Sequence, residues 1–233
     1  MTRLVFQCVV LIAVLTAATV ARAQHFSVVP KFGGRTLTTE QLAANAEFVA
    51  GIDAQYKGDR VKAAEDLARA GWTSLTLEPM AWEHPMRRFN QAWMVNPYEP
   101  TALWGMAVAT SRSGGYKKAA ELMEEALARG SYFDNARFLS DFGLIVLNIA
   151  VENRYQSTWE NAITLFEKAH RIDPQLRINL YNWSLAYFAH AQYEDAAAKL
   201  ELALATPDGV RIGQDYISLV EQKINRPIIK KEQ

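Results

Sequence analysis

The sequence predicts an all-α fold built from stacked antiparallel helix pairs. The stretches F-N-Q-A-W-M-V-N-P and F-E-K-A-H-R-I-D-P, which begin at Phe89 and Phe166, place Phe, Ala and Pro at the same intervals. Apolar and small residues also repeat in 34-residue register over 143–176 and 177–210. A period of this length is typical of helical units that stack into a solenoid and bury their apolar faces on each other.

The composition fits a globular chain without a nucleic-acid partner. Half of the 233 residues are hydrophobic and 21% are charged, which is globular rather than disordered composition. Lys plus Arg (25) balances Asp plus Glu (25). The chain therefore lacks the excess of basic residues that would indicate binding to nucleic acid or to an anionic membrane surface.

Residues 1–23 have the pattern of a cleaved secretory signal peptide. A short positive start at Arg3 precedes an apolar run over 4–20, and Ala21-Arg22-Ala23 supplies small residues for cleavage. The alternative is an uncleaved anchor helix. Such a helix needs about 20 apolar residues, and this run is slightly shorter. We expect export to the periplasm, with secretion left open and no integral membrane segment after cleavage. Because the single cysteine, Cys8, lies in this peptide, the mature chain would have no thiol chemistry.

The next segments form the predicted start of the fold. Residues 24–37 have no helical period and contain Gly33-Gly34, so we expect a linker. Thr38 and Gln41 fit a capping box, which predicts a helix ending at Gly58. Residues 38–65 are therefore an N-terminal helix or a degenerate repeat.

Residues 66–99 match the repeat pattern in their second half only. Phe89 and Ala92 stand in register, but the first half is irregular. Pro85 suits the first turn of a helix that starts near His84. We interpret this segment as a degenerate repeat.

Residues 100–133 give the clearest repeat. Ala107, Ala119 and Ala126 lie where two helices are expected to cross closely, and a larger side chain there would cost about 1–3 kcal/mol. Gly114-Gly115 supplies a turn, since positive φ is accessible to glycine.

The rest of the chain continues the array. Nine extra residues, 134–142, predict a lengthened helix or a loop before the repeats 143–176 and 177–210. Apolar residues on one face predict a helix over 211–225 that caps the array. We expect 226–233 to be a frayed polar tail.

On these motifs the chain resembles the tetratricopeptide repeat (TPR) family over residues 66–224. The segment 86–97 also resembles a stretch found in small exported bacterial proteins of that family. The resemblance implies a right-handed superhelix of about four helix pairs with a concave groove. Members commonly bind peptides or helices of other proteins in this groove and are not themselves catalytic.

The family uses groove-facing residues of the first helix in each repeat, so the resemblance implies a set of binding residues here. Their wall would be aromatic and aliphatic with two arginines, and it lacks the Lys and Asn pattern that clamps a terminal carboxylate. Val151 and Ala189 occupy equivalent positions. The expected groove residues are Trp104, Val108, Arg112, Leu147, Arg154, Tyr155, Tyr181, Leu185 and Phe188. Alternatively, several of them are covered by the N-terminal segment or by residues 134–142, and the two arginines are simply solvated.

The sequence contains no recognisable catalytic or metal-binding pattern. None of the four histidines shares an i, i+4 spacing with another, and no H-E-x-x-H is present. There is neither a G-x-S-x-G motif nor a phosphate-binding loop. We therefore expect a protein that is not an enzyme and uses no cofactor or metal.

The leading hypothesis is a scaffold of the cell envelope that binds a protein or peptide segment in its concave groove. Aromatic anchors such as Trp104, Tyr181 and Phe188 would supply much of the affinity. Two alternatives remain open: a carrier of a small apolar ligand within the superhelix, and a structural envelope protein that associates with itself.

Overall fold

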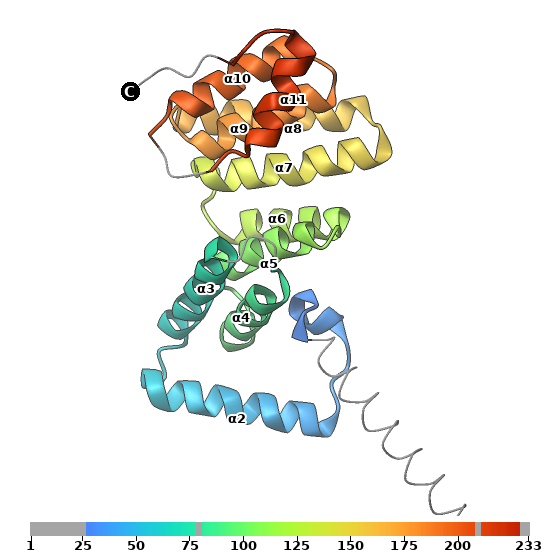
Figure 1. Ribbon diagram of the computed structural model, residues 1–233. Coiled ribbons are helices and arrows are strands. Elements are labelled where there is room, and N and C mark those ends of the chain that lie inside the picture. Colours follow the sequence, from blue (N-terminus) through green and yellow to red (C-terminus); the bar gives the residue numbers. More distant parts are fainter. Residues whose placement is uncertain (1–26, 78–80, 208–210, 229–233) are drawn as a thin grey trace, which may run out of the picture. The chain divides into compact units, whose positions relative to one another are not determined.

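The computed structural model describes residues 27–77, 81–207 and 211–228, so the expected signal peptide lies outside the described residues. The described chain is all-helical, with ten α-helices, one 3-10 helix and no strand, which confirms the predicted fold class (Figure 1). None of the helices described is both long enough and apolar enough to cross a membrane. The chain divides into two compact units, Met1–Gly114 and Gly115–Gln233.

Helices that follow each other in the chain pack against each other. The first unit contains η1 (Pro30–Gly34), α2 (Thr39–Tyr56), α3 (Arg60–Leu77), α4 (Glu83–Val95) and α5 (Pro100–Arg112). The second contains α6 (Tyr116–Arg129), α7 (Ala136–Asn153), α8 (Gln156–Ile172), α9 (Arg177–Ala189), α10 (Tyr193–Ala205) and α11 (Gln214–Ile224). The most extensive packing joins α3 to α4, α7 to α8 and α9 to α10, so the units are solenoid-like.

The start of α2 confirms the predicted capping box. The Thr38 hydroxyl accepts a bond from the Gln41 N–H at 3.3 Å, and the Gln41 side chain accepts one from the Thr38 N–H at 3.0 Å. The helix ends where Lys57 and Gly58 take positive φ angles of 54° and 82°. The N–H groups of both residues donate to the Asp53 carbonyl in the last turn of α2, and the chain then reverses into α3.

Helix α3 runs across the expected boundary between residues 38–65 and 66–99. No proline interrupts Arg60–Leu77, so the backbone continues as one helix. This helix pairs with α4, whose Pro85 stands in the first turn as expected. The packed helix pair therefore begins earlier than the degenerate repeat read from sequence.

The two repeated phenylalanines are core residues, and each packs against glycine. Phe89 and Phe166 are fully buried. A Cβ atom placed on Gly71 or Gly105 would come within 2.6 or 2.2 Å of the Phe89 ring, and one on Gly143 within 2.6 Å of the Phe166 ring. Each ring thus occupies space that a glycine on a neighbouring helix leaves open.

The sequence leaves a lengthened helix or a loop open for residues 134–142, and the structure shows a lengthened helix. The Asn135 side chain accepts a bond from the Phe138 N–H at 2.9 Å and so caps α7, which begins at Ala136. Residues 136–142 form its first two turns. They are largely buried: Phe138 and Ser140 are fully so.

Helix α11 confirms the expected C-terminal cap. Ile217 and Val220 are buried in a cluster with Leu200 of α10. Burial of such side chains stabilises by about 1.5–3 kcal/mol each, so α11 covers the apolar face that the last pair would otherwise expose.

The expectation of a frayed tail is wrong for residues 226–228. Arg226 bonds to Glu201 at 2.7 Å and to Glu194 at 3.3 Å, and Ile228 is buried with α11. The Arg226 ion pairs and the burial of Ile228 together fix this segment on α10 and α11. Residues 229–233 lie outside the residues that the structure describes.

The expected linker also packs onto the fold from Ser27 onward. Val28 is buried, and the fully buried Asn90 side chain of α4 donates to the carbonyls of Ser27 and Val29, both at 2.8 Å. Its oxygen accepts a bond from the Lys31 N–H at 2.8 Å. A single amide therefore satisfies three backbone groups of η1 and the residues before it.

Candidate partner-binding surface

The most accessible group of expected groove residues lies at the turn between α7 and α8. Arg154 ends α7 in a left-handed conformation (φ 56°), and its N–H bonds to the Ala150 carbonyl. Tyr155 follows as the N-cap residue of α8. Both side chains are exposed. They project from a tight turn rather than from the face of the first helix, where the repeat register put them.

Aromatic contacts fix the opposite side of this turn to the end of α9. The Trp159 indole N–H donates to the Ala186 carbonyl at 2.9 Å. Its ring stacks on His190, with centroids 4.1 Å apart and planes 18° from parallel. His190 Nε2 is also 2.6 Å from the Gln156 side-chain oxygen. These contacts join the start of α8 to the end of α9.

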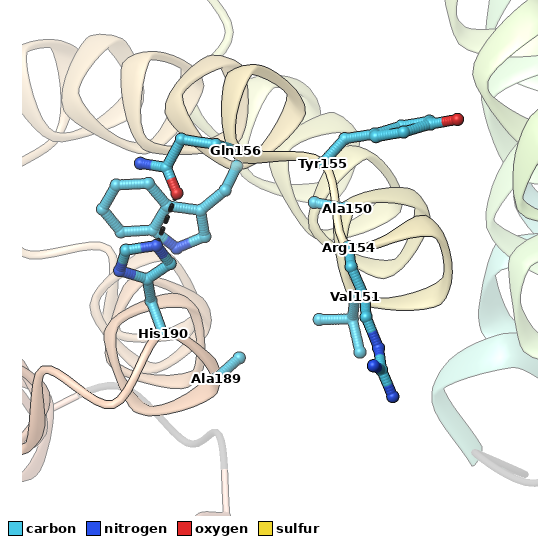
Figure 2. Close-up of a pocket in the computed structure, with 8 residues that line it drawn as sticks. Ala150, Val151, Arg154, Tyr155, Gln156, Ala189 and His190 are labelled. Carbon is cyan, nitrogen blue, oxygen red and sulfur yellow. Dashed lines mark hydrogen bonds between the residues drawn. The ribbon is translucent and has the colours of Figure 1, made fainter.

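Between these two sides lies a cavity of about 360 Å³. Figure 2 shows Val151 and Arg154 on one side and Gln156, His190 and Ala189 on the other; the Tyr155 ring points away from His190. The lining residues are Ala150, Val151, Arg154, Tyr155, Gln156, Trp159, Ala189 and His190. The lining holds one permanent positive charge and no carboxylate.

Tyr181 and Phe188, two of the expected groove residues, are half-buried and contact α11. The ring of Tyr216 lies edge-on to both, at centroid distances of 5.5 and 5.7 Å. The Tyr216 and Ser184 hydroxyls are 2.7 Å apart, and burial raises the pKa of Tyr216 to about 12. The capping helix thus occupies the face expected to receive a partner.

Leu147 belongs to the core rather than to a groove. It is 3% exposed and packs with Phe166, Trp183 and Ala186. Leu185 is half-buried against the same cluster. The cause is close packing of α7, α8 and α9, which leaves no open channel at Leu147.

The expected residues of α5 make contacts within the first unit. Trp104 packs edge-on against Trp72 of α3, with centroids 4.7 Å apart. Arg112 donates to the Leu75 carbonyl at 3.0 Å, near the end of α3. Val108 is half-buried. Arg112 therefore has a structural role, because it satisfies a carbonyl that the helix end leaves without a partner.

Sequence reasoning missed Gln156, Trp159 and His190 as surface-forming residues. Neither Trp159 nor His190 belongs to a sequence motif that indicates a binding surface. The two are 31 positions apart, and their stacking depends on how α8 meets α9. No local spacing signals such a contact.

Among the described residues there is no group of three or more His, Cys, Asp or Glu side chains that could hold a metal ion. No protein-family model matches the chain, and neither does any curated protein.

Proposed function

We propose that this protein is an exported, TPR-type scaffold that binds a segment of another protein and catalyses no reaction. The N-terminal signal pattern supports export, and the family resemblance supports the binding role. The partner would be a protein or peptide of the bacterial envelope, bound without a cofactor or a metal.

The observation that carries this proposal is an exposed apolar pair on a rigid support. Val151 and Tyr155 are 55% and 62% exposed and both line the cavity. Exposed apolar side chains beside a preformed hollow are typical of binding surfaces. Since the Trp159–His190 stack already holds this region, little ordering would be lost on binding.

The surface at the α7–α8 turn replaces the full concave groove as the proposed site. Arg154 and Tyr155 remain in it, and Val151 and Ala189 join them. Leu147 is left out because it is buried in the core, and Tyr181 and Phe188 because they are half-buried against Tyr216 of α11.

Co-purification from extracts of the source organism tests this function. The wild type is compared with Val151→Glu/Tyr155→Glu, which places two charges on the proposed surface. The matched control is Leu202→Glu/Leu219→Glu, which changes two exposed leucines of α10 and α11 (48% and 40% exposed).

We expect a protein that binds the wild type and the control and is lost with the first variant. Equal retention by all three would contradict the proposed surface. Failure to retain any protein, with a small molecule seen in native mass spectrometry, would favour the carrier alternative.

A further inference from the structure

The cavity at the α7–α8 turn has the size of an anchor site rather than of a large ligand pocket. Its volume of about 360 Å³ is near the lower end of the 300–1,000 Å³ that small-molecule pockets span. A space of this size suits one large side chain with part of its backbone. In protein interfaces, such pockets commonly receive the residues that contribute most to affinity.

The cavity walls favour an apolar side chain. Val151 presents its methyl groups on one side, and Ala150 and Ala189 contribute only methyl groups. On the other side the Trp159 indole N–H and the His190 Nε2 atom already have partners, at the Ala186 carbonyl and the Gln156 side chain. An occupant would therefore gain apolar contact there without breaking a hydrogen bond.

Arg154 adds one directional charge. Within the part of the chain that the structure describes, its guanidinium makes no hydrogen bond or ion pair. The lining contains no carboxylate that could compete for it. A guanidinium binds a carboxylate through two parallel hydrogen bonds, which makes it selective for acidic groups.

We propose that this cavity binds an internal peptide segment in which a large apolar residue adjoins an Asp or Glu. The apolar side chain fills the cavity, and the neighbouring carboxylate pairs with Arg154. This inference rests on the proposed function and names the chemistry of its partner. A side-chain carboxylate is favoured over a chain terminus because terminal carboxylates are held by nests of backbone N–H groups, whereas here a single guanidinium is available.

Selection of random linear peptides displayed on phage, with the purified full chain as bait, tests the inference. We expect enriched peptides to share a large apolar residue next to an acidic one. With Arg154→Glu as bait, the preference should change from acidic to basic at that position. The matched control, Lys168→Glu, makes the same charge change at an exposed site on α8 and should keep the acidic preference.

Binding of one enriched peptide, synthesised with an amidated C-terminus, gives the quantitative test. Arg154→Gln should weaken it about tenfold, the usual effect of losing one charge-assisted hydrogen bond. Ala189→Trp should abolish binding by filling the cavity while leaving Arg154 in place. Melting temperatures close to that of the wild type establish that both variants are folded.

Any of three outcomes would overturn the inference. One is that the wild type enriches no peptide; another is that enriched peptides bind Arg154→Glu and Ala189→Trp as well as the wild type. A peptide that binds only with a free C-terminus would also overturn it, in favour of terminal recognition. The co-purification experiment tests the proposed function separately, so the peptide chemistry can be wrong while the protein still binds a partner protein.

Discussion

At the scale of single residues, Asn90 shows how one buried amide can hold a whole segment. Its three hydrogen bonds join α4 to the backbone of Ser27, Val29 and Lys31. Asn90→Ala should reduce the free energy of unfolding by about 1–3 kcal/mol, because buried backbone groups would lose their partners. Amide hydrogen exchange over residues 27–34 should become faster.

The neighbouring Gln91→Ala serves as the control for Asn90. Gln91 accepts a bond from Arg88 within the same helix, so its loss should leave exchange over residues 27–34 unchanged. Slow exchange in both variants would show that Asn90 does not hold the segment.

His170 predicts a pH dependence of stability. Burial lowers its pKa below the ordinary value of 6.5, and the nearby Lys199 charge adds to the shift. The unfolded state then binds more protons than the folded state just below pH 6.5, so this contribution to stability is lost as the pH falls through that window. Between pH 7 and pH 5, the melting temperature of the wild type should fall more than that of His170→Gln. Equal decreases would contradict this role.

At the scale of helices, close packing depends on the glycines that face the two phenylalanines. Gly143→Ala should destabilise by about 1–3 kcal/mol, because the new methyl group would overlap the Phe166 ring. The control Gly51→Ala adds the same methyl group to α2 where no atom lies within 4 Å, and should stabilise by up to about 1 kcal/mol. Chemical denaturation measures both. Stabilisation by both substitutions would contradict the packing of α7 on α8.

In the turn between α9 and α10, a substitution by glycine is expected to stabilise the protein. Ala191 has a φ of 59°, a left-handed conformation that costs an L-residue about 1–2 kcal/mol. Ala191→Gly should remove this strain. Because glycine also makes the unfolded chain more flexible, which offsets part of the gain, the melting temperature should rise only slightly. Ala198→Gly, at an exposed position inside α10, should instead cost about 1 kcal/mol. A similar loss in both variants would show that the turn is not left-handed.

At the scale of the whole molecule, sequence predicted the helices better than the surface. Helix starts, breakers and the spacing around Phe89 and Phe166 are local signals, and they gave the all-α class, the capping box and α11. The span of α3 was harder, because its start at Arg60 lies outside the repeat spacing.

The candidate site was only partly predictable because exposure depends on contacts between distant residues. The repeat register placed Arg154, Tyr155 and Phe188 on one expected surface. It could not show that Tyr216 covers Phe188, or that Arg154 lies in the turn after α7. What covers a helix face is decided by elements elsewhere in the chain, here by α11.

The most direct test of the central claim is site-specific photo-cross-linking in living cells. A photoreactive amino acid replaces Tyr155 in one variant and the exposed Leu219 of α11 in another. We predict a discrete cross-linked product with a second protein at position 155, lost on adding Arg154→Glu, and none at position 219. The same products at both positions, or none at position 155 in a folded and abundant protein, would contradict a binding surface at the α7–α8 turn.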